Sequence, residues 1–213
     1  MLSELRIVTI KDGQMDNWLD LFRDRVAPLA SRLDIQISGA WTDVERRRFI
    51  QIRSFEDADN MAASRARFID HREWRAIERR VLDLAPEQDI VQLQPIWHFD
   101  DWNNNWHLQN MEHSPLAQLR MYTIKEGMLA DWEDLFKRYE IPGHQAAGIP
   151  IEWLSHDLEE ERFFWIRSFE NEWEMEASQN RFHEGLDWQA IKDRVPTMLA
   201  HTEVMMMNPV EFE

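Results

Sequence analysis

Four arginines lie among apolar residues in segments that favour β-strands: Arg6, Arg53, Arg120 and Arg167. A guanidinium group inside an apolar sheet must reach solvent, a carboxylate or a ligand. Its planar fork matches carboxylate and phosphate groups, so one hypothesis is that these arginines bind a small anionic molecule. The alternative is an ion pair within the chain, with acids such as Glu56 and Glu170 as the partners.

Three aromatic residues could complete such a site. Tyr122 follows Arg120 by two positions, and its counterpart in an earlier, similar segment is Val8. Trp41 and Trp153 end two further expected strands, where they could line a pocket for an aromatic ligand. Core packing is the alternative reading of both tryptophans, because their large rings fill protein interiors.

The sequence gives little support for a bound metal ion or cofactor. The chain has no cysteine, which excludes thiolate ligands, disulfides and a cysteine nucleophile. It has no Gly-rich phosphate loop, no Gly-x-Ser-x-Gly and no His-Glu-x-x-His. His107, Glu112 and His113 come closest to a metal-ligand set, at unfavourable spacing. We therefore expect neither a metal nor a cofactor.

The amino-acid composition narrows the classes of partner that the protein could bind. The 213 residues include 40 acidic and 24 basic side chains, a formal net charge of -16. Such an acidic protein is a poor ligand for nucleic acid or for anionic membrane surfaces. No apolar run approaches the ~18 residues of a membrane span, and the first residues lack a signal-peptide pattern. We expect a cytoplasmic protein with no membrane insertion.

The chain repeats itself. Leu5–Gly13 recurs as Leu119–Gly127, 114 positions later, and Ile52–Glu56 recurs as Ile166–Glu170 at the same offset. Near Trp41 the best match drifts by two residues and then returns, which predicts a deletion in one loop and an insertion in the next. Two copies of one module in tandem explain this pattern.

Each copy has the same expected elements. In the first, residues 5–10 favour a strand, and residues 14–32 carry apolar side chains at helical spacing. Residues 35–42 and 48–54 favour two strands, a helical region in two pieces follows Ser54, and residues 89–97 favour a last strand. In the second copy the first helix is expected to stop near Pro142-Gly143.

This order predicts an α+β fold of two ferredoxin-like βαββαβ modules. The third strand is apolar on both faces, with Ile50 and Ile52 on one side and Phe49 on the other. A strand of that kind is buried on both faces, so we expect the modules to form an intramolecular dimeric α/β barrel. We divide the chain into a first module at 1–99, a linker at 100–117 and a second module at 118–213. Further pairing into a homo-oligomer is left open.

The two openings, Leu5–Gly13 and Leu119–Gly127, resemble the start of a NIPSNAP domain, Leu-Arg-x-Tyr-Thr followed by Gly. Arg67 with Asp70–Trp74, and Arg181 with Asp187-Trp188, resemble the later Arg-rich helix and Asp-x-x-Trp-like segment of that family. The resemblance covers both copies. The first copy departs from the pattern at Val8, so a site that needed this tyrosine would remain in the second copy alone.

The resemblance implies membership of the dimeric α/β-barrel superfamily. That group includes cofactor-free monooxygenases, haem-degrading enzymes, lactone isomerases and proteins without known activity, and NIPSNAP proteins themselves are linked to vesicle transport and mitochondrial roles. Three hypotheses follow. The chain is a small-molecule-binding or accessory protein of undefined activity, a cofactor-independent monooxygenase- or isomerase-like enzyme, or a structural assembly module.

Overall fold

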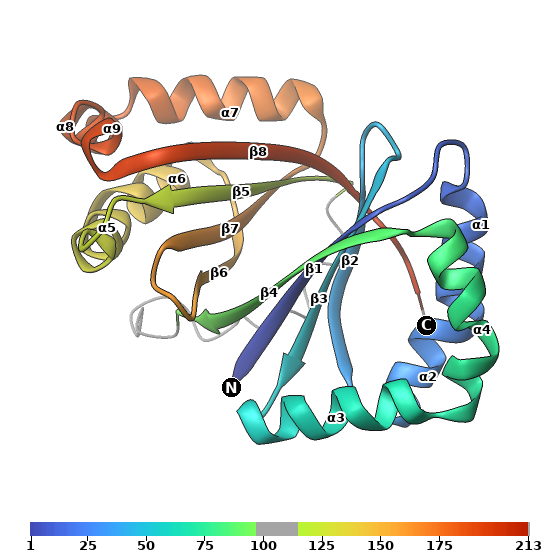
Figure 1. Cartoon of the computed structure of the whole chain (residues 1–213). Helices are drawn as coiled ribbons and strands as arrows, with labels where there is room; N and C mark the ends of the chain where they lie inside the picture. The colour runs from blue at the N-terminus through green and yellow to red at the C-terminus, as the bar shows by residue number, and fades with distance from the viewer. Residues whose placement is uncertain (97–114, 213) are drawn as a thin grey trace. The chain divides into compact units, whose positions relative to one another are not determined.

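The computed structural model describes residues 1–96 and 115–212 (Figure 1). Most of the linker predicted at 100–117 lies outside the described residues. The candidate metal group of His107, Glu112 and His113 also lies outside them. Strand β5 begins at Leu116, which is inside the predicted linker.

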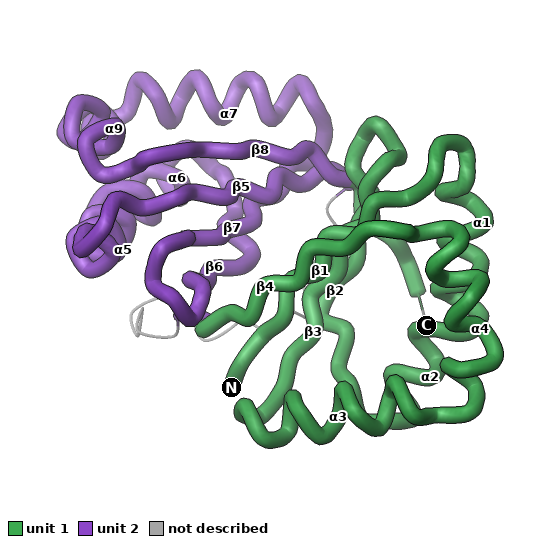
Figure 2. Tube along the Cα trace, viewed as in Figure 1, with its two compact units in different colours: residues 1–94, 208–213 green, residues 95–207 purple. Residues whose placement is uncertain are grey.

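The chain forms two compact units, which Figure 2 colours separately. Unit 1 consists of Met1–Gln94 with Asn208–Glu213, and unit 2 consists of Pro95–Met207. The end of the chain belongs to unit 1 because it packs there. The Val210 N–H donates to the carbonyl of Ala40 at 2.9 Å, and the ring of Phe212 contacts that of Phe22 at a centroid distance of 5.4 Å.

Unit 1 has the order strand, helix, strand, strand, helix, strand, with its helices on one face of its strands (Figure 1). The first helix contains a π-helical turn, η1, and the second is divided in two. The elements are β1 (Leu2–Thr9), α1 (Met15–Leu21), η1 (Phe22–Val26), α2 (Ala27–Arg32), β2 (Gln36–Asp43), β3 (Arg48–Phe55), α3 (Ala58–Asp70), α4 (Arg72–Leu84) and β4 (Glu87–Pro95).

Unit 2 repeats this order, again with the helices on one face (Figure 1). Its elements are β5 (Leu116–Ile124), α5 (Leu129–Leu135), η3 (Phe136–Glu140), α6 (Ile141–Ala147), β6 (Ile151–Asp157), β7 (Arg162–Phe169), α7 (Glu172–Glu184), α8 (Leu186–Ile191), α9 (Val195–Met198) and β8 (Leu199–Pro209). The prediction of two βαββαβ modules is confirmed.

Each unit builds one antiparallel sheet, with the strand order β4-β1-β3-β2 in unit 1 and β8-β5-β7-β6 in unit 2. Side chains alternate between two faces of the sheet. Val8 and Phe49 face the helices, where they share a core with Trp18. Ile50 and Ile52 point the other way and are fully buried. The prediction that this strand is buried on both faces is therefore confirmed.

Local signals set the element boundaries. Asp57 caps α3, its carboxylate accepting the N–H of Asn60 at 2.8 Å, and Asn171 caps α7 in the same way. The β2–β3 turn is held by Asp43, whose Oδ1 accepts the N–H groups of Arg47 and Arg48 at 2.7 and 2.9 Å. These contacts recur 114 positions later, so the two units share their turns and caps.

The expected helix stop near Pro142-Gly143 is wrong. The helix continues from Leu129 to Ala147, and Gly148, at φ 77°, ends it. Pro142 lies in the first turn of α6, directly after the π-helical turn η3. That turn changes the hydrogen-bond spacing, so a residue without an N–H fits where it would break a regular helix.

The expected two-residue drift near Trp41 is also wrong. Gly39 pairs with Ile52, and Trp153 pairs with Ile166, so Gly39 is the true counterpart of Trp153. The indole of Trp41 folds back over Gly39, where a Cβ would lie 2.2 Å from its Cη2 atom. Each unit thus places an indole over the same point of the sheet from a different residue. The sequence comparison aligned Trp41 with Trp153 because both are tryptophans, although Trp153 corresponds in the backbone to Gly39.

Among the residues that the structure describes, no helix is long and apolar enough to cross a membrane. Met205 and Met207 are buried in β8.

Candidate functional site

Unit 1 brings Arg6 and Arg53 together on the helix-facing side of its sheet. Arg6 lies in β1 opposite Gln51, and Arg53 lies in β3 opposite Glu4. Because cross-strand partners share a face, all four side chains project toward the helices. The two arginines that the sequence singled out in this copy are therefore neighbours.

The carboxylate beside these arginines is Glu4, and it is fully buried. Arg6 and Arg65 both donate to it, with Arg65 Nε at 2.6 Å from Glu4 Oε2. Burial acts to raise the pKa of Glu4, but the charges of Arg6 and Arg53 and the hydrogen bonds from Arg6 and Arg65 together outweigh burial and lower it. Sequence reasoning missed Glu4 and named Glu56. The available signal was that Glu4 and Arg6, two positions apart on a strand, point the same way.

A cavity of about 510 Å³ lies within unit 1, between the sheet and the helices. This volume is within the range of small-molecule sites. Three guanidinium groups line it, those of Arg6, Arg53 and Arg65, together with Gln51 from β3. Most of the remaining wall is apolar: Val8, Trp18, Phe22, Val26, Phe68, Ile69, Trp74, Val81, Leu82, Ala85 and Ile90.

Arg53 is the distinctive group of this cavity. Its side chain is buried, its guanidinium lies 5.2 Å from the centre of the Phe68 ring, and its Nε has no hydrogen-bond partner among the described residues. Burial and the nearby charges of Arg6 and Arg65 lower the pKa of Arg53 to about 9, against a smaller opposing effect of Glu4. A buried donor without a partner is costly, so the site is short of acceptors.

In unit 2 the counterparts of these arginines both have a hydrogen-bonded Nε. Arg167 Nε donates to Gln118 Oε1 at 2.7 Å, and its Nη1 donates to His144 Nε2 at 3.1 Å. Arg120 Nε donates to the Tyr122 hydroxyl at 2.7 Å, and its guanidinium lies 5.2 Å from the Trp165 ring centre. The structure thus brings together three of the four unit 2 residues that the sequence proposed as binding residues, Arg120, Tyr122 and Arg167, with side chains of the chain itself as partners.

His144 and Glu140, from the helix above, complete this cluster, and sequence reasoning missed both. Arginine can only donate, so His144 Nε2 accepts from Arg167, and His144 Nδ1 donates to the carbonyl of Glu140 at 2.7 Å. Burial, with the charge of Arg167, lowers the pKa of His144 to about 3. Burial raises the pKa of Glu140 to about 7, although Arg120 and Arg167 oppose it. A helical spacing of four residues between two titratable groups was the available signal.

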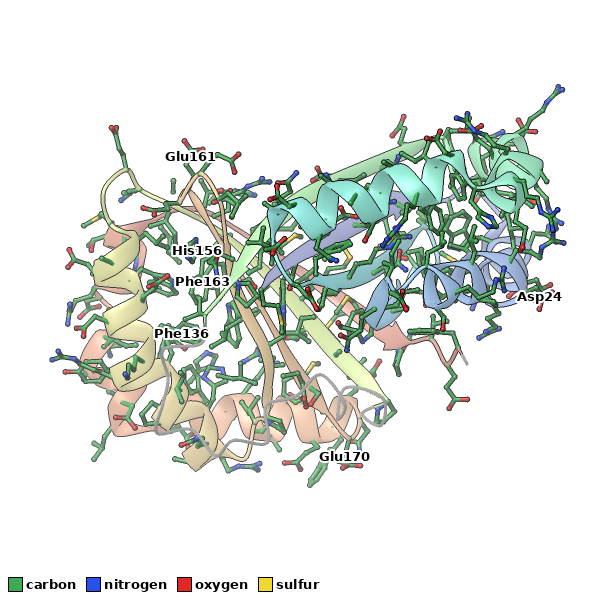
Figure 3. The ribbon with its side chains drawn as sticks, turned by 90° about the horizontal axis from the view of Figure 1, so that it is seen from below. Asp24, Phe136, His156, Glu161, Phe163 and Glu170 are labelled. Atoms are coloured by element: carbon green, nitrogen blue, oxygen red, sulfur yellow. The ribbon has the colours of Figure 1, made fainter. Side chains whose placement is uncertain are left out.

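Aromatic rings pack around this cluster in unit 2. Phe136 from η3 and Phe163 from β7 lie ring against ring at a centroid distance of 4.9 Å, and both are labelled in Figure 3. Trp165 lies beside Phe136 at 5.2 Å. The buried indole nitrogens of Trp132 and Trp165 have no hydrogen-bond partner within residues 1–96 and 115–212, and the same holds for Trp18 in unit 1. These indoles therefore do not distinguish the two units.

Trp41 and Trp153, the two further predicted site residues, lie elsewhere. Trp41 pairs with Ile50 and Trp153 pairs with Ile166, which places both on the sheet face opposite the arginines. The structure does not bring them to the charged clusters. Within residues 1–96 and 115–212, no group of three histidine, aspartate or glutamate side chains could hold a metal ion.

The NIPSNAP family model matches the chain twice, at residues 3–96 and 117–213. The chain belongs to the NIPSNAP family. The resemblance drawn from the two opening motifs is therefore confirmed in both copies. A search of the curated proteins finds no match.

Solved structures similar to this NIPSNAP chain include matches to the whole chain and matches to about half of it. A monooxygenase candidate from Lactobacillus acidophilus NCFM is 9% identical with a TM-score of 0.65, over 99% of this chain and 94% of that one. An anthrone oxidase-like protein is 11% identical with a TM-score of 0.64, over 99% and 91%. An uncharacterized NIPSNAP domain protein from Burkholderia xenovorans is 23% identical with a TM-score of 0.43, over 46% and 97%.

The two whole-chain likenesses establish the fold at identities too low to carry an activity. They confirm the predicted fold class, an α+β fold of the dimeric α/β-barrel kind. The family itself does not name a reaction, so the function must be argued from the site.

Proposed function

We propose that this NIPSNAP protein binds a small anionic molecule in the cavity of unit 1. The observation that carries the proposal is Arg53, a buried guanidinium that faces a cavity of about 510 Å³ and whose Nε has no hydrogen-bond partner in the part of the chain that the structure describes. A carboxylate or another anionic group with two or three acceptor oxygens would satisfy that donor. The apolar wall would hold the rest of the molecule.

The charge balance of the cavity favours an anion. Arg6, Arg53 and Arg65 share one buried carboxylate, Glu4. The acidic residue that lines the cavity, Glu78, lies 3.6 Å from Arg75. Positive charge is therefore in excess inside a protein whose net charge is -16. In a partly dry site, each guanidinium attracts an anion more strongly than it would in water.

The other two hypotheses have less support. The resemblance to a monooxygenase candidate and to an anthrone oxidase-like protein reaches the fold alone, so the enzyme reading lacks a residue with an assigned role. A purely structural module would need neither a cavity nor a buried guanidinium donor without a partner among the described residues, so these two features disfavour the structural hypothesis. Cytoplasmic location and assembly into a homo-oligomer remain predictions.

The test uses 1-naphthoate, an aromatic monocarboxylate, and follows tryptophan fluorescence, because Trp18 and Trp74 line the cavity. Saturable quenching is expected from the wild-type chain. Arg53→Met should weaken binding roughly 10- to 100-fold, since a hydrogen bond to a charged group contributes about 1.5–3 kcal/mol. Because Arg53→Met removes a buried cation, it should not lower the unfolding temperature.

The matched control is Arg138→Met, which removes an exposed arginine of unit 2 that pairs with Asp134. It should bind 1-naphthoate like the wild type. Cationic 1-naphthylmethylamine, of similar size, should not compete. Failure of 1-naphthoate to bind the wild-type chain at up to about 10 mM, or equal binding by Arg53→Met, would refute the proposal.

A further inference from the structure

The two units can be compared position by position, because they share one fold. At several buried positions unit 1 carries a smaller side chain where unit 2 carries a larger polar or aromatic one. Four buried positions around the arginines differ in this way. With the unit 1 residue first, the pairs are Val8 and Tyr122, Val26 and Glu140, Ala30 and His144, and Gln51 and Trp165. In each pair the unit 1 residue is smaller. The space that these side chains occupy in unit 2 is thus vacated in unit 1, where three of the four residues line the cavity.

Glu140 is the informative member of this set. It projects from η3, its carboxylate is buried, and the charges that act on it most are those of Arg120 and Arg167. Unit 2 therefore places a carboxyl group, on an aliphatic stem from its own helix, near its two sheet arginines. In unit 1 the same position of the helix holds Val26, which is part of the cavity wall.

We propose that the ligand of unit 1 is a monocarboxylate on an apolar body, and that its carboxylate takes the place beside Arg6 and Arg53 that Glu140 takes beside their counterparts in unit 2. This inference rests on the proposed function and adds the chemical class and orientation of the ligand. Glu140 is the model for such a ligand, because it presents one carboxyl group on an aliphatic stem near the two arginines.

The apolar side chains of the cavity wall indicate where the apolar part of the ligand would lie. From the arginines, the wall continues through Phe22, Phe68 and Trp74. It ends at Ile69 and Leu82, which are 47% and 57% exposed and so mark the mouth of the cavity. An alkyl or aryl body that runs outward from the arginines would cover these side chains. A second charge on the ligand would lie among them without a partner, which disfavours dicarboxylates.

The first experiment is a chain-length series, acetate, hexanoate, octanoate and decanoate, titrated calorimetrically into the wild-type chain. Affinity should rise up to about fourfold with each methylene group until the cavity is filled. Sebacate, which has the length of decanoate and a second carboxylate, should bind at least tenfold more weakly than decanoate. Inorganic phosphate should not compete with decanoate.

The second experiment builds the unit 2 carboxylate into unit 1. Val26→Glu should lower decanoate affinity at least 30-fold, because the new side chain occupies the place of the ligand. Val26→Gln has nearly the same size without the charge and should lose less affinity. Val44→Glu adds the same charge at an exposed turn residue and should bind normally. The unfolding temperature of each variant, measured in parallel, shows whether it is folded.

The outcomes separate this inference from the proposed function. If neither decanoate nor 1-naphthoate binds, the proposed function itself fails. If 1-naphthoate binds but acetate, decanoate and sebacate have equal affinities, the proposed function stands and the ligand class is wrong. If a folded Val26→Glu variant binds decanoate like the wild type, the place assigned to the carboxylate is wrong.

Discussion

Replacement of Glu140 by glutamine should remove a pH dependence from the stability of unit 2. Burial raises the pKa of this carboxyl to about 7, whereas its ordinary value is 4.5. Between these values the folded chain holds a proton that the unfolded chain has released. The stabilisation from that proton is complete below pH 4.5 and is lost as the pH rises through 7.

The size of the effect follows from the two pKa values. Each pH unit between them corresponds to about 1.4 kcal/mol, so the wild-type chain should lose about 3 kcal/mol relative to Glu140→Gln as the pH rises from about 4.5 to 8. The neutral amide keeps the volume of the side chain, and the backbone carbonyl that accepts from His144 is retained.

The assay is urea denaturation of both chains at several pH values from 5 to 8, with the difference in unfolding free energy plotted against pH. Glu184→Gln, at an exposed residue of α7, is the control and should show a flat difference. A difference for Glu140→Gln that stays constant within about 0.5 kcal/mol would mean that the carboxylate is ionised throughout. The burial argument for Glu140 would then be refuted.

Three further changes test other parts of the structure. Gly39→Ala should lower the unfolding free energy by about 1–3 kcal/mol in urea, because its Cβ would overlap the buried indole of Trp41; an unchanged value would contradict the position of that ring. His144→Phe should reduce acid sensitivity, since a pKa of about 3 means that wild-type stability, complete above pH 6.5, is lost as the pH falls toward 3. Urea titrations at pH 7 and 4 check this, and an equal loss in both chains would count against it. Asp57→Ala and Asn171→Ala should each cost about 1 kcal/mol of stability, additively, because each removes one helix cap; thermal melts of the single and double variants measure it.

The local pattern of the sequence was sufficient for the elements. Strand alternation around Ile50 and Ile52 indicated burial on both faces, and apolar spacing from Trp18 to Leu29 indicated the first helix. Both results depend on periodicities of two and 3.6 residues, which neighbouring residues determine by themselves. The repeat at 114 positions then transferred the fold from one copy to the other.

Tertiary structure decided which of the predicted site residues meet. Arg6 and Arg53 lie 47 positions apart in the chain, and the pairing register of β1 with β3 puts them on one face while turning Trp41 to the other. The strand alternation could have paired Glu4 with Arg6, but the contacts of Glu4 with Arg53 and Arg65 depend on a second strand and a helix that only the fold brings together. The π-helical turn before Pro142 was equally hidden, since the sequence shows the breaker but not the hydrogen-bond spacing that accommodates it.

The sequence by itself determined that there are two modules of one fold, with arginines at matching places. The difference between the modules could be read only from the packing. Val26 and Glu140 are unremarkable in a list of residues, because an acid on a helix is usually at the surface. Once the helix is laid on the sheet, Glu140 faces arginines and Val26 faces a cavity. Burial depends on which elements pack together, and that is a property of the whole fold.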